Sequence, residues 1–428
     1  MENINEKNKF KNIFLFTLYY TFIVSFFVNE LIPHKFNVLI FMVLIPFVYS
    51  KNVFSLKHYL NLTNYFLINI VVLIFYIFEL STVLNLLQVL IATFFFSCLG
   101  YGISAKNNIN EFIEILIENL MIIFFISIIL TTILTLIGYP FIINYYFWDT
   151  LSSDGSAVFK ILTKDGTGHS SANTILPILF CLMQYNFFKK DKNKKLLSLF
   201  LMILFAYLAY LTKSRTTHFL IILISLSSFT YLGFSWFKKY FKIIIIIIGF
   251  LFLSLSAKPT YSYNPFEFKI LNFVTSLDPF TDEEKKLNNT SVFFSARDKL
   301  NQYLLNEISK KPIFGIGHTD DVFKYGVGSD LNIAYDLKTS AKSESILVIP
   351  AKYGLPYFLI LMIFIIFIPF TFYNLKKNEL ALFQNFWSII FISVISSGGL
   401  LSMYGISGFY FLILCILYFF GKTKNIYY

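Results

Sequence analysis

Two arginines are the residues whose type and position most clearly indicate chemistry in this sequence. Of its 35 lysine and arginine residues, 33 are lysines, and the two arginines are Arg215 and Arg297. A lysine-biased genome explains the lysines but not these two exceptions. The planar guanidinium group binds a phosphate or carboxylate through two parallel hydrogen bonds, which an ammonium group cannot do. We therefore predict that both arginines bind an anion.

Arg297 lies in the first turn of a predicted helix that Ser295 and Asp298 begin as a capping box and Pro312 ends. The apolar face of this helix consists of Leu300, Leu304 and Ile308. The helix dipole disfavours arginine in a first turn by a few tenths of a kcal/mol to about 1 kcal/mol. Two explanations remain open for Arg297: an anion held jointly by the guanidinium group and the free amides of the helix start, or an ion pair with Asp298 or another surface acid.

Arg215 lies in a short turn between two apolar segments, at the predicted amino-terminal end of the second one. Ser214 or Thr216 can cap that helix, so the setting repeats that of Arg297. The alternative is an arginine that extends to lipid phosphate at a membrane surface. Because ionisable groups at a membrane edge so often serve function, we assign Ser214 and Arg215 to the anion site.

Two further predicted helix starts are polar, one at Gly168-His169 and one at Ser343-Glu344. Four helix starts around one pocket would suit a pyrophosphate, whose charge would be met by two arginines, His169 and several backbone amides. For His169 the alternative is an interfacial histidine without a chemical role.

Glu344 and His318 are the candidate catalytic bases. A carboxylate at the lip of an apolar span is partly desolvated and therefore becomes a stronger base. His318 follows a Gly-Ile-Gly turn in the same polar segment as Arg297. The sequence does not choose between the two.

The sequence predicts neither a metal ion nor a cofactor. It contains no Walker motif, HExxH, CxxC or DxD pair in its polar segments, and Asp320-Asp321 is an isolated acidic pair. The three cysteines Cys98, Cys181 and Cys415 lie in apolar segments, so a disulfide framework and a zinc site are not expected either.

The elements that must position these side chains are membrane helices. The chain of 428 residues is 57% hydrophobic and 14% charged, far from the composition of a soluble domain. We expect an all-α polytopic membrane protein with about twelve spans, each long enough to cross about 30 Å of hydrocarbon. The predicted spans are 13–28, 36–49, 62–78, 82–102, 113–140, 171–188, 196–211, 217–234, 241–256, 346–373, 383–398 and 405–420.

The lysines set the predicted orientation. If the amino terminus is cytoplasmic, alternation of the spans places the short lysine-rich loops inside, including 189–195 and 376–377. The segments left outside are 145–169, 212–216, 257–342 and 398–405. The positive-inside pattern accounts for the net charge of +11, so no nucleic-acid partner is expected. The domain prediction is residues 1–256 with nine spans, 257–342 as a large, partly helical outer loop, and 343–428 with three spans.

The order of these features resembles a known family. A span that ends near Ser214-Arg215 precedes an outer loop with Ser295-Ala296-Arg297, and the next span begins at Ser343-Glu344. The remaining matching stretches are Lys311-Pro312-Ile313-Phe314-Gly315-Ile316-Gly317 and Tyr353-Gly354-Leu355. Together they resemble the superfamily of O-antigen ligases and O-antigen polymerases of the bacterial inner membrane, over about residues 160–375.

The resemblance implies a metal-independent glycosyltransferase whose active site faces the periplasm. The implied partners are an undecaprenyl-diphosphate-linked oligosaccharide donor and acceptor, membrane lipid and a chain-length regulator protein. Arg215 and Arg297 would bind the diphosphate. Ligases usually carry a histidine followed by asparagine where this chain has Ser343-Glu344, so the resemblance favours a polymerase.

Two alternatives accompany the polymerase. The ligase would use the same donor and transfer the finished glycan to lipid A core. A transporter or flippase for the lipid-linked unit could also have about twelve spans, but this sequence shows no paired Gly/Pro-broken spans in corresponding halves.

Overall fold

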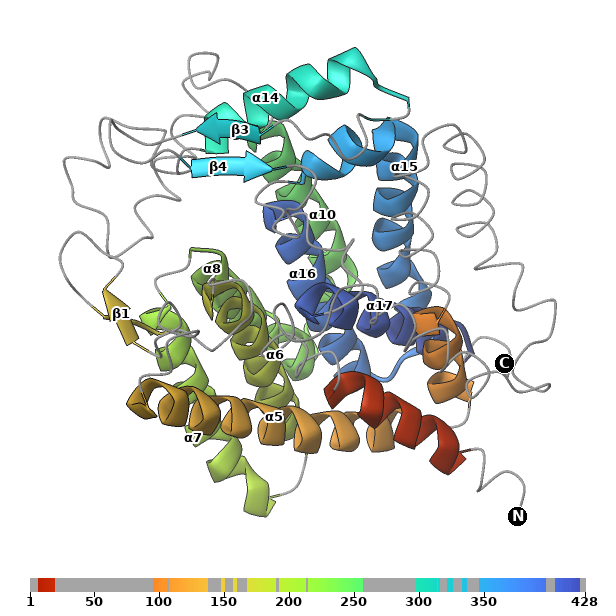
Figure 1. The fold of residues 1–428 in the computed structure, drawn as a ribbon. Helices are drawn as coiled ribbons and strands as arrows, with labels where there is room; N and C mark the ends of the chain where they lie inside the picture. Colours follow the sequence, from red (N-terminus) through yellow and green to blue (C-terminus); the bar gives the residue numbers. More distant parts are fainter. Residues whose placement is uncertain are drawn as a thin grey trace.

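The protein is a bundle of helices with two short antiparallel ribbons (Figure 1). The computed structural model describes residues 7–19, 95–105, 108–137, 148–150, 157–159, 168–189, 192–212, 215–256, 297–313, 315, 322–325, 333–336, 346–397 and 405–423. The all-α class predicted from the sequence is confirmed.

Most of the described helices coincide with predicted spans. They are the helical stretches 7–19 and 95–105, α5 (Ile109–Ile137), α6 (Gly168–Phe188), α7 (Lys192–Leu211), α8 (Arg215–Leu226), α9 (Ser228–Leu232), α10 (Ser235–Ser256), α14 (Arg297–Lys310), α15 (Val348–Phe367), the 3-10 helix η3 (Ile368–Asn374), α16 (Lys377–Ser397) and α17 (Gly405–Thr423). Helices α7, α10 and α16 begin earlier than predicted, because each includes a lysine-containing turn before its apolar run.

The two ribbons were not predicted. β1 (Trp148–Thr150) pairs with β2 (Ala157–Phe159), and β3 (Val322–Tyr325) pairs with β4 (Ile333–Asp336). Both lie in segments that the sequence predicted to be outside the membrane. The strands have three or four residues each, too short for the alternation of apolar and polar residues to stand out.

One predicted span is wrong as a single helix. The span 217–234 is divided into α8 and α9 by a turn at Ser227, whose backbone N–H still donates to Leu223 O (3.1 Å). The segment contains no proline to signal the break. The interruption instead depends on polar contacts from other helices, described below.

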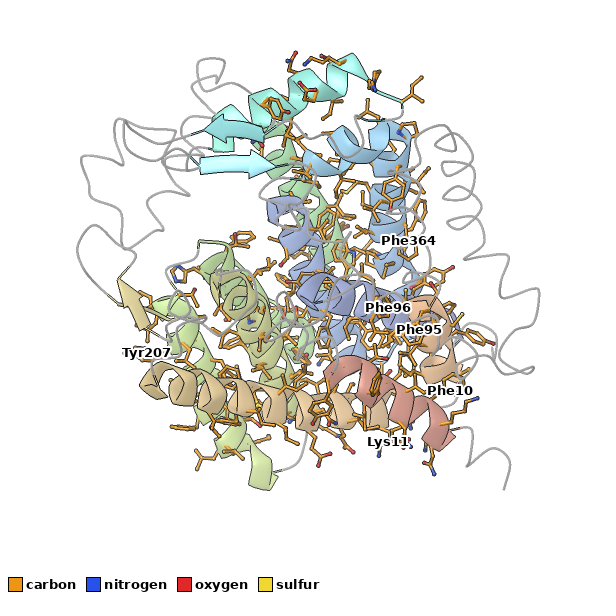
Figure 2. All side chains as sticks on the ribbon, in the orientation of Figure 1. Phe10, Lys11, Phe95, Phe96, Tyr207 and Phe364 are labelled. Carbon is orange, nitrogen blue, oxygen red and sulfur yellow. The ribbon has the colours of Figure 1, made fainter. Side chains whose placement is uncertain are left out.

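Helix α16 forms the centre of the bundle. It packs against α6, α8, α9, α10, α17 and η3, and nearly all of its membrane-length stretch is buried. Trp387 is fully buried, and its Nε1–H donates to Ile365 O of α15 (2.8 Å). The stretches 7–19 and 95–105 also contact each other, because a Cβ atom at Gly102 would collide with the ring of the fully buried Phe10, which is labelled in Figure 2. Helix α5 runs across the lower end of the bundle in Figure 1 rather than alongside α10 and α15.

Large apolar side chains cover the outside of several helices. Along α15 the exposed positions recur every fourth residue at Leu355, Leu359, Ile363 and Phe367, and Phe367 is 63% exposed. On α7, Leu196, Phe200, Ile203, Tyr207 and Tyr210 are exposed in the same manner. These stripes follow one face of each helix, which is the face turned away from the bundle.

Two of the described helical segments are long and apolar enough to cross a membrane, Gly354–Phe372 and Lys377–Ile395. The first lies within the predicted span 346–373, and the second overlaps the predicted span 383–398 but begins six residues earlier. The described part of the chain therefore accounts for two of the about twelve spans predicted from the sequence, and the remainder stays a prediction.

The packing of α10 on α16 can be tested at Gly249. A Cβ atom there would lie 2.7 Å from Ile395 Cδ1 and would also collide with the ring of Phe391. We expect Gly249→Leu to destabilise the protein by about 1–3 kcal/mol, as overpacking of a core does, and to lower the unfolding temperature in detergent micelles. The matched control is Ser254→Leu, at an exposed position of the same helix, which should unfold near the wild-type temperature. Equal unfolding temperatures for the two variants would contradict this packing.

Candidate functional site

Both arginines stand at the first residue of a helix, as predicted. Helix α8 begins at Arg215 and α14 begins at Arg297. The first turn of α8, Arg-Thr-Thr-His, has no acidic residue, whereas α14 begins Arg-Asp, so that Asp298 follows Arg297 directly. The guanidinium groups lie outside the described part of the structure, so the distance between them stays a prediction.

The remaining predicted site residues are described only in part. His169 is the second residue of α6, and its imidazole lies outside the described residues. Ser214, His318 and Glu344 also lie outside them. The described chain resumes at Ile346, two residues after Glu344.

Helix α14 rests on α15 through the apolar face that the sequence predicted. Leu304 is fully buried and Ile308 is nearly so, and α14 contacts α15. The last turn carries Lys310, whose Nζ donates to Glu307 Oε1, so the predicted cationic end is also confirmed. This packing fixes the axis of α14 and therefore the position of its first residue, Arg297.

A tight turn follows α14 and joins it to α15. Gly315 has a φ of 68°, and its N–H donates to Lys311 O (2.9 Å). The carbonyl of Pro312 accepts a hydrogen bond from the Leu355 N–H (2.8 Å). Two stretches that the sequence singled out separately, Lys311–Gly315 and Tyr353–Leu355, are therefore in direct contact.

Gly354 explains why this contact exists. Its backbone has φ 82° and ψ 162°, a conformation that residues with a side chain rarely adopt. The conformation interrupts α15, so Leu355 loses the helical bond to Ala351 O and donates to Pro312 O instead. Pro356 follows, at a position where a helix start does not need its missing N–H. Figure 1 shows the resulting bend between a short first part of α15 and its long second part.

A buried polar cluster that sequence reasoning missed lies between α6, α8 and α16. Gln184 is fully buried, and its Nε2 donates to Ile224 O (2.8 Å) and to Ser228 Oγ (2.7 Å). Its Oε1 accepts from Asn385 Nδ2 (3.0 Å). The amide group of Gln184 thus reaches both sides of the turn at Ser227 and fixes the break between α8 and α9.

The signal for this cluster was present in the sequence. Polar side chains within apolar spans are costly to bury and are retained for a role. Gln184 and Asn385 each stand in such a span, and Ser227-Ser228 stands in a third. Three isolated polar positions in three predicted spans indicate a shared contact, although their spacing alone does not say which pairs meet.

No group of three or more histidine, cysteine, aspartate or glutamate side chains that could hold a metal ion occurs among the residues that the structure describes. The three cysteines are free and buried, in agreement with their prediction as core residues. Comparison with protein-family models, with curated proteins and with solved structures finds no match to this chain.

The docked turn can be tested by Gly354→Ala. A Cβ atom is strained at this backbone conformation by about 1–3 kcal/mol, which corresponds to roughly a fivefold to hundredfold larger open population. We expect faster amide hydrogen exchange at Leu355 and at Gly315 than in the wild type, because the Pro312–Leu355 bond opens more often. Leu355→Ala is the control, since it keeps both the N–H and the glycine. If the two variants exchange alike, Gly354 does not hold the turn in place.

Proposed function

We propose that this protein is a bacterial inner-membrane polymerase that joins undecaprenyl-diphosphate-linked oligosaccharide repeat units at the periplasmic face. The product would be O-antigen or a related surface polysaccharide. The proposal rests on the order of the sequence stretches that resemble the ligase and polymerase superfamily, and it treats the protein as a metal-independent glycosyltransferase.

The observation that carries the proposal is the placement of the two arginines. In a chain with 33 lysines, both arginines occupy the first residue of a helix, where free backbone N–H groups point outward. A guanidinium group beside such N–H groups suits a phosphate group. Two such helix starts would meet the two phosphates of a diphosphate leaving group.

The mechanism assigns each residue a role. A hydroxyl oxygen of one lipid-linked repeat unit attacks the anomeric carbon of the growing chain, and the bond from that carbon to the diphosphate oxygen breaks. The electron pair leaves with undecaprenyl diphosphate, whose charge Arg215 and Arg297 stabilise together with Ser214 and His169. The proton of the attacking hydroxyl passes to Glu344 or His318.

The proposal includes about twelve membrane spans with a cytoplasmic amino terminus. Contacts between distant segments support the alternation of sides on which this topology depends. Lys7 pairs with Glu111 (2.7 Å) and Lys189 pairs with Glu114 (2.8 Å), and the orientation places all four on the inner side. The turn after α14 contacts the start of α15, and the orientation places both on the outer side. The exposed apolar stripes of α7 and α15 would face lipid, with α5 as a strongly tilted span.

The test of function is the electrophoretic profile of surface lipopolysaccharide from a strain that lacks the gene. Complementation with wild type should restore a ladder of polymer lengths. Arg215→Lys and Arg297→Lys keep the charge but lose the two-pronged hydrogen bond. Each should slow polymerisation by about 10²-fold, as the loss of one transition-state donor does, and leave core carrying a single repeat.

Lys195→Arg is the control for a lysine–arginine exchange, at an exposed position of α7, and should restore the full ladder. If deletion of the gene leaves bare core while lipid-linked polymer accumulates, the protein is the ligase. A ladder that is unchanged by the deletion would falsify both assignments.

The orientation can be tested with a membrane-impermeant maleimide, because the three native cysteines are buried. Ser309 of α14 and Lys195 of α7 are both exposed, and the orientation places them on opposite sides. We expect Ser309→Cys to react in intact spheroplasts, whereas Lys195→Cys should react only after permeabilisation. The unmodified protein gives the background. Reaction of Lys195→Cys in intact spheroplasts would reverse the orientation and place the arginines inside.

A further inference from the structure

We propose that an anionic phospholipid binds at the junction of the α9–α10 turn with the η3–α16 turn, with Lys242 and Lys377 holding its headgroup phosphate. The inference goes beyond glycosyl transfer and depends only on the membrane location of the protein. Lipid binding and polymerase activity are measured by separate experiments, so the failure of one proposal can be told from the failure of the other.

Two contacts bring these turns together. The Nζ of Lys242, in the second turn of α10, lies 4.4 Å from the centroid of the Phe370 ring in η3. The Nζ of Lys377, the first residue of α16, packs against Gly233 in the turn before α10. A Cβ atom added to Gly233 would lie 2.8 Å from this Nζ. Gly233 has a φ of 96°. The α9–α10 segment and the η3–α16 segment therefore contact each other at two places, each of which carries an ammonium group.

Among the described residues, the lysines of this area form no salt bridge. Lys239, Lys376 and Lys377 are exposed, and Lys242 is partly exposed. The ion pairs of the described chain involve other lysines, such as Lys7 and Lys189. Glu379, the nearest acid along α16, is buried and accepts a hydrogen bond from the backbone N–H of Lys376 (3.2 Å). An anion from outside the chain would complete the set.

The same area also exposes large apolar side chains. Leu232, Phe234 and Trp236 are each more than half exposed on the α9–α10 turn, and Phe367 is 63% exposed at the end of α15. Tryptophan beside lysine is typical of the boundary between acyl chains and headgroups. A free phosphate would use only the lysines, whereas a phospholipid would use both the lysines and the apolar side chains.

A structural ion pair with a carboxylate is the simpler use of a surface lysine, and the protein does use Lys7 and Lys189 in this way. The junction differs because its lysines come from two turns that pack together and face exposed aromatic rings. This combination of charge and apolar surface is what selects a lipid over a soluble anion.

The test uses the purified full chain in detergent. The rise in unfolding temperature is titrated with phosphatidylglycerol and, separately, with phosphatidylcholine. We expect phosphatidylglycerol to raise the unfolding temperature and phosphatidylcholine to have a much smaller effect. In the double variant Lys242→Gln/Lys377→Gln the apparent affinity for phosphatidylglycerol should fall, roughly fivefold for each lysine removed.

Three controls keep the result specific. Lys195→Gln removes an exposed lysine from α7 and should leave the titration unchanged. Lys377→Arg keeps the charge and should retain the affinity. Without lipid, the double variant should unfold close to wild type, which shows that it is folded.

Each of the following outcomes would overturn the proposal. Equal effects of the two lipids would mean that headgroup charge is not recognised. An unchanged titration in the double variant would place the lipid elsewhere, and an equal loss in Lys195→Gln would indicate surface charge in general. Stabilisation by inorganic phosphate alone, to the same extent, would identify a soluble anion as the ligand.

Discussion

The need to give each freed backbone N–H or C=O a partner shapes this structure at its helix breaks. Water can complete a broken helix at a protein surface, but a freed N–H or C=O that is buried away from water needs a partner from the chain. The break at Ser227 is bridged by the amide of Gln184, which donates to Ile224 O. The break at Gly354 is bridged by Pro312, whose carbonyl accepts from Leu355 N–H. At the start of α16, Glu379 accepts from Lys376 N–H.

These partners also explain how the bundle is held together. Each partner group belongs either to a different segment from the broken helix or to the next turn of the same helix. Gln184 ties α6 to α8 and, through Asn385, to α16. Pro312 ties the segment after α14 to α15. A polar contact inside an apolar bundle has few competing partners, so each one specifies which helices meet and in which register.

The sequence predicted the helices well and their interruptions poorly. Long apolar runs predicted α6, α10, α15, α16 and α17, because about 20 apolar residues leave few alternatives to a helix. The break at Ser227 escaped prediction because neither proline nor glycine marks it, and its cause, Gln184, is 43 residues away from Ser227 in the chain. The two ribbons escaped because strands of three or four residues carry almost no periodic signal.

In the candidate site, too, the local features could be predicted from the sequence and the long-range contacts could not. The sequence predicted that Arg215 and Arg297 start helices, since capping residues and the change from polar to apolar composition are local signals. It also singled out Pro312 and Gly354 as parts of two motifs. That these two meet could not be predicted, because the hydrogen bond joins residues 312 and 355 across the β3–β4 segment. Long-range contacts of this kind depend on packing that no single stretch encodes.

The uneven use of lysine and arginine follows from what each side chain can do. A lysine is a mobile point charge that suits a diffuse anionic surface, and several described lysines, such as Lys189 and Lys377, lie at helix ends. An arginine holds a fixed plane of donors, which is of use only where the anion is held as firmly as the guanidinium group. Helix α14 is held in this way, because Leu304 and Ile308 are buried against its neighbours and the following turn is bonded to α15. A rigid helix start is therefore where an arginine gains most over lysine, and both arginines of this chain stand at helix starts.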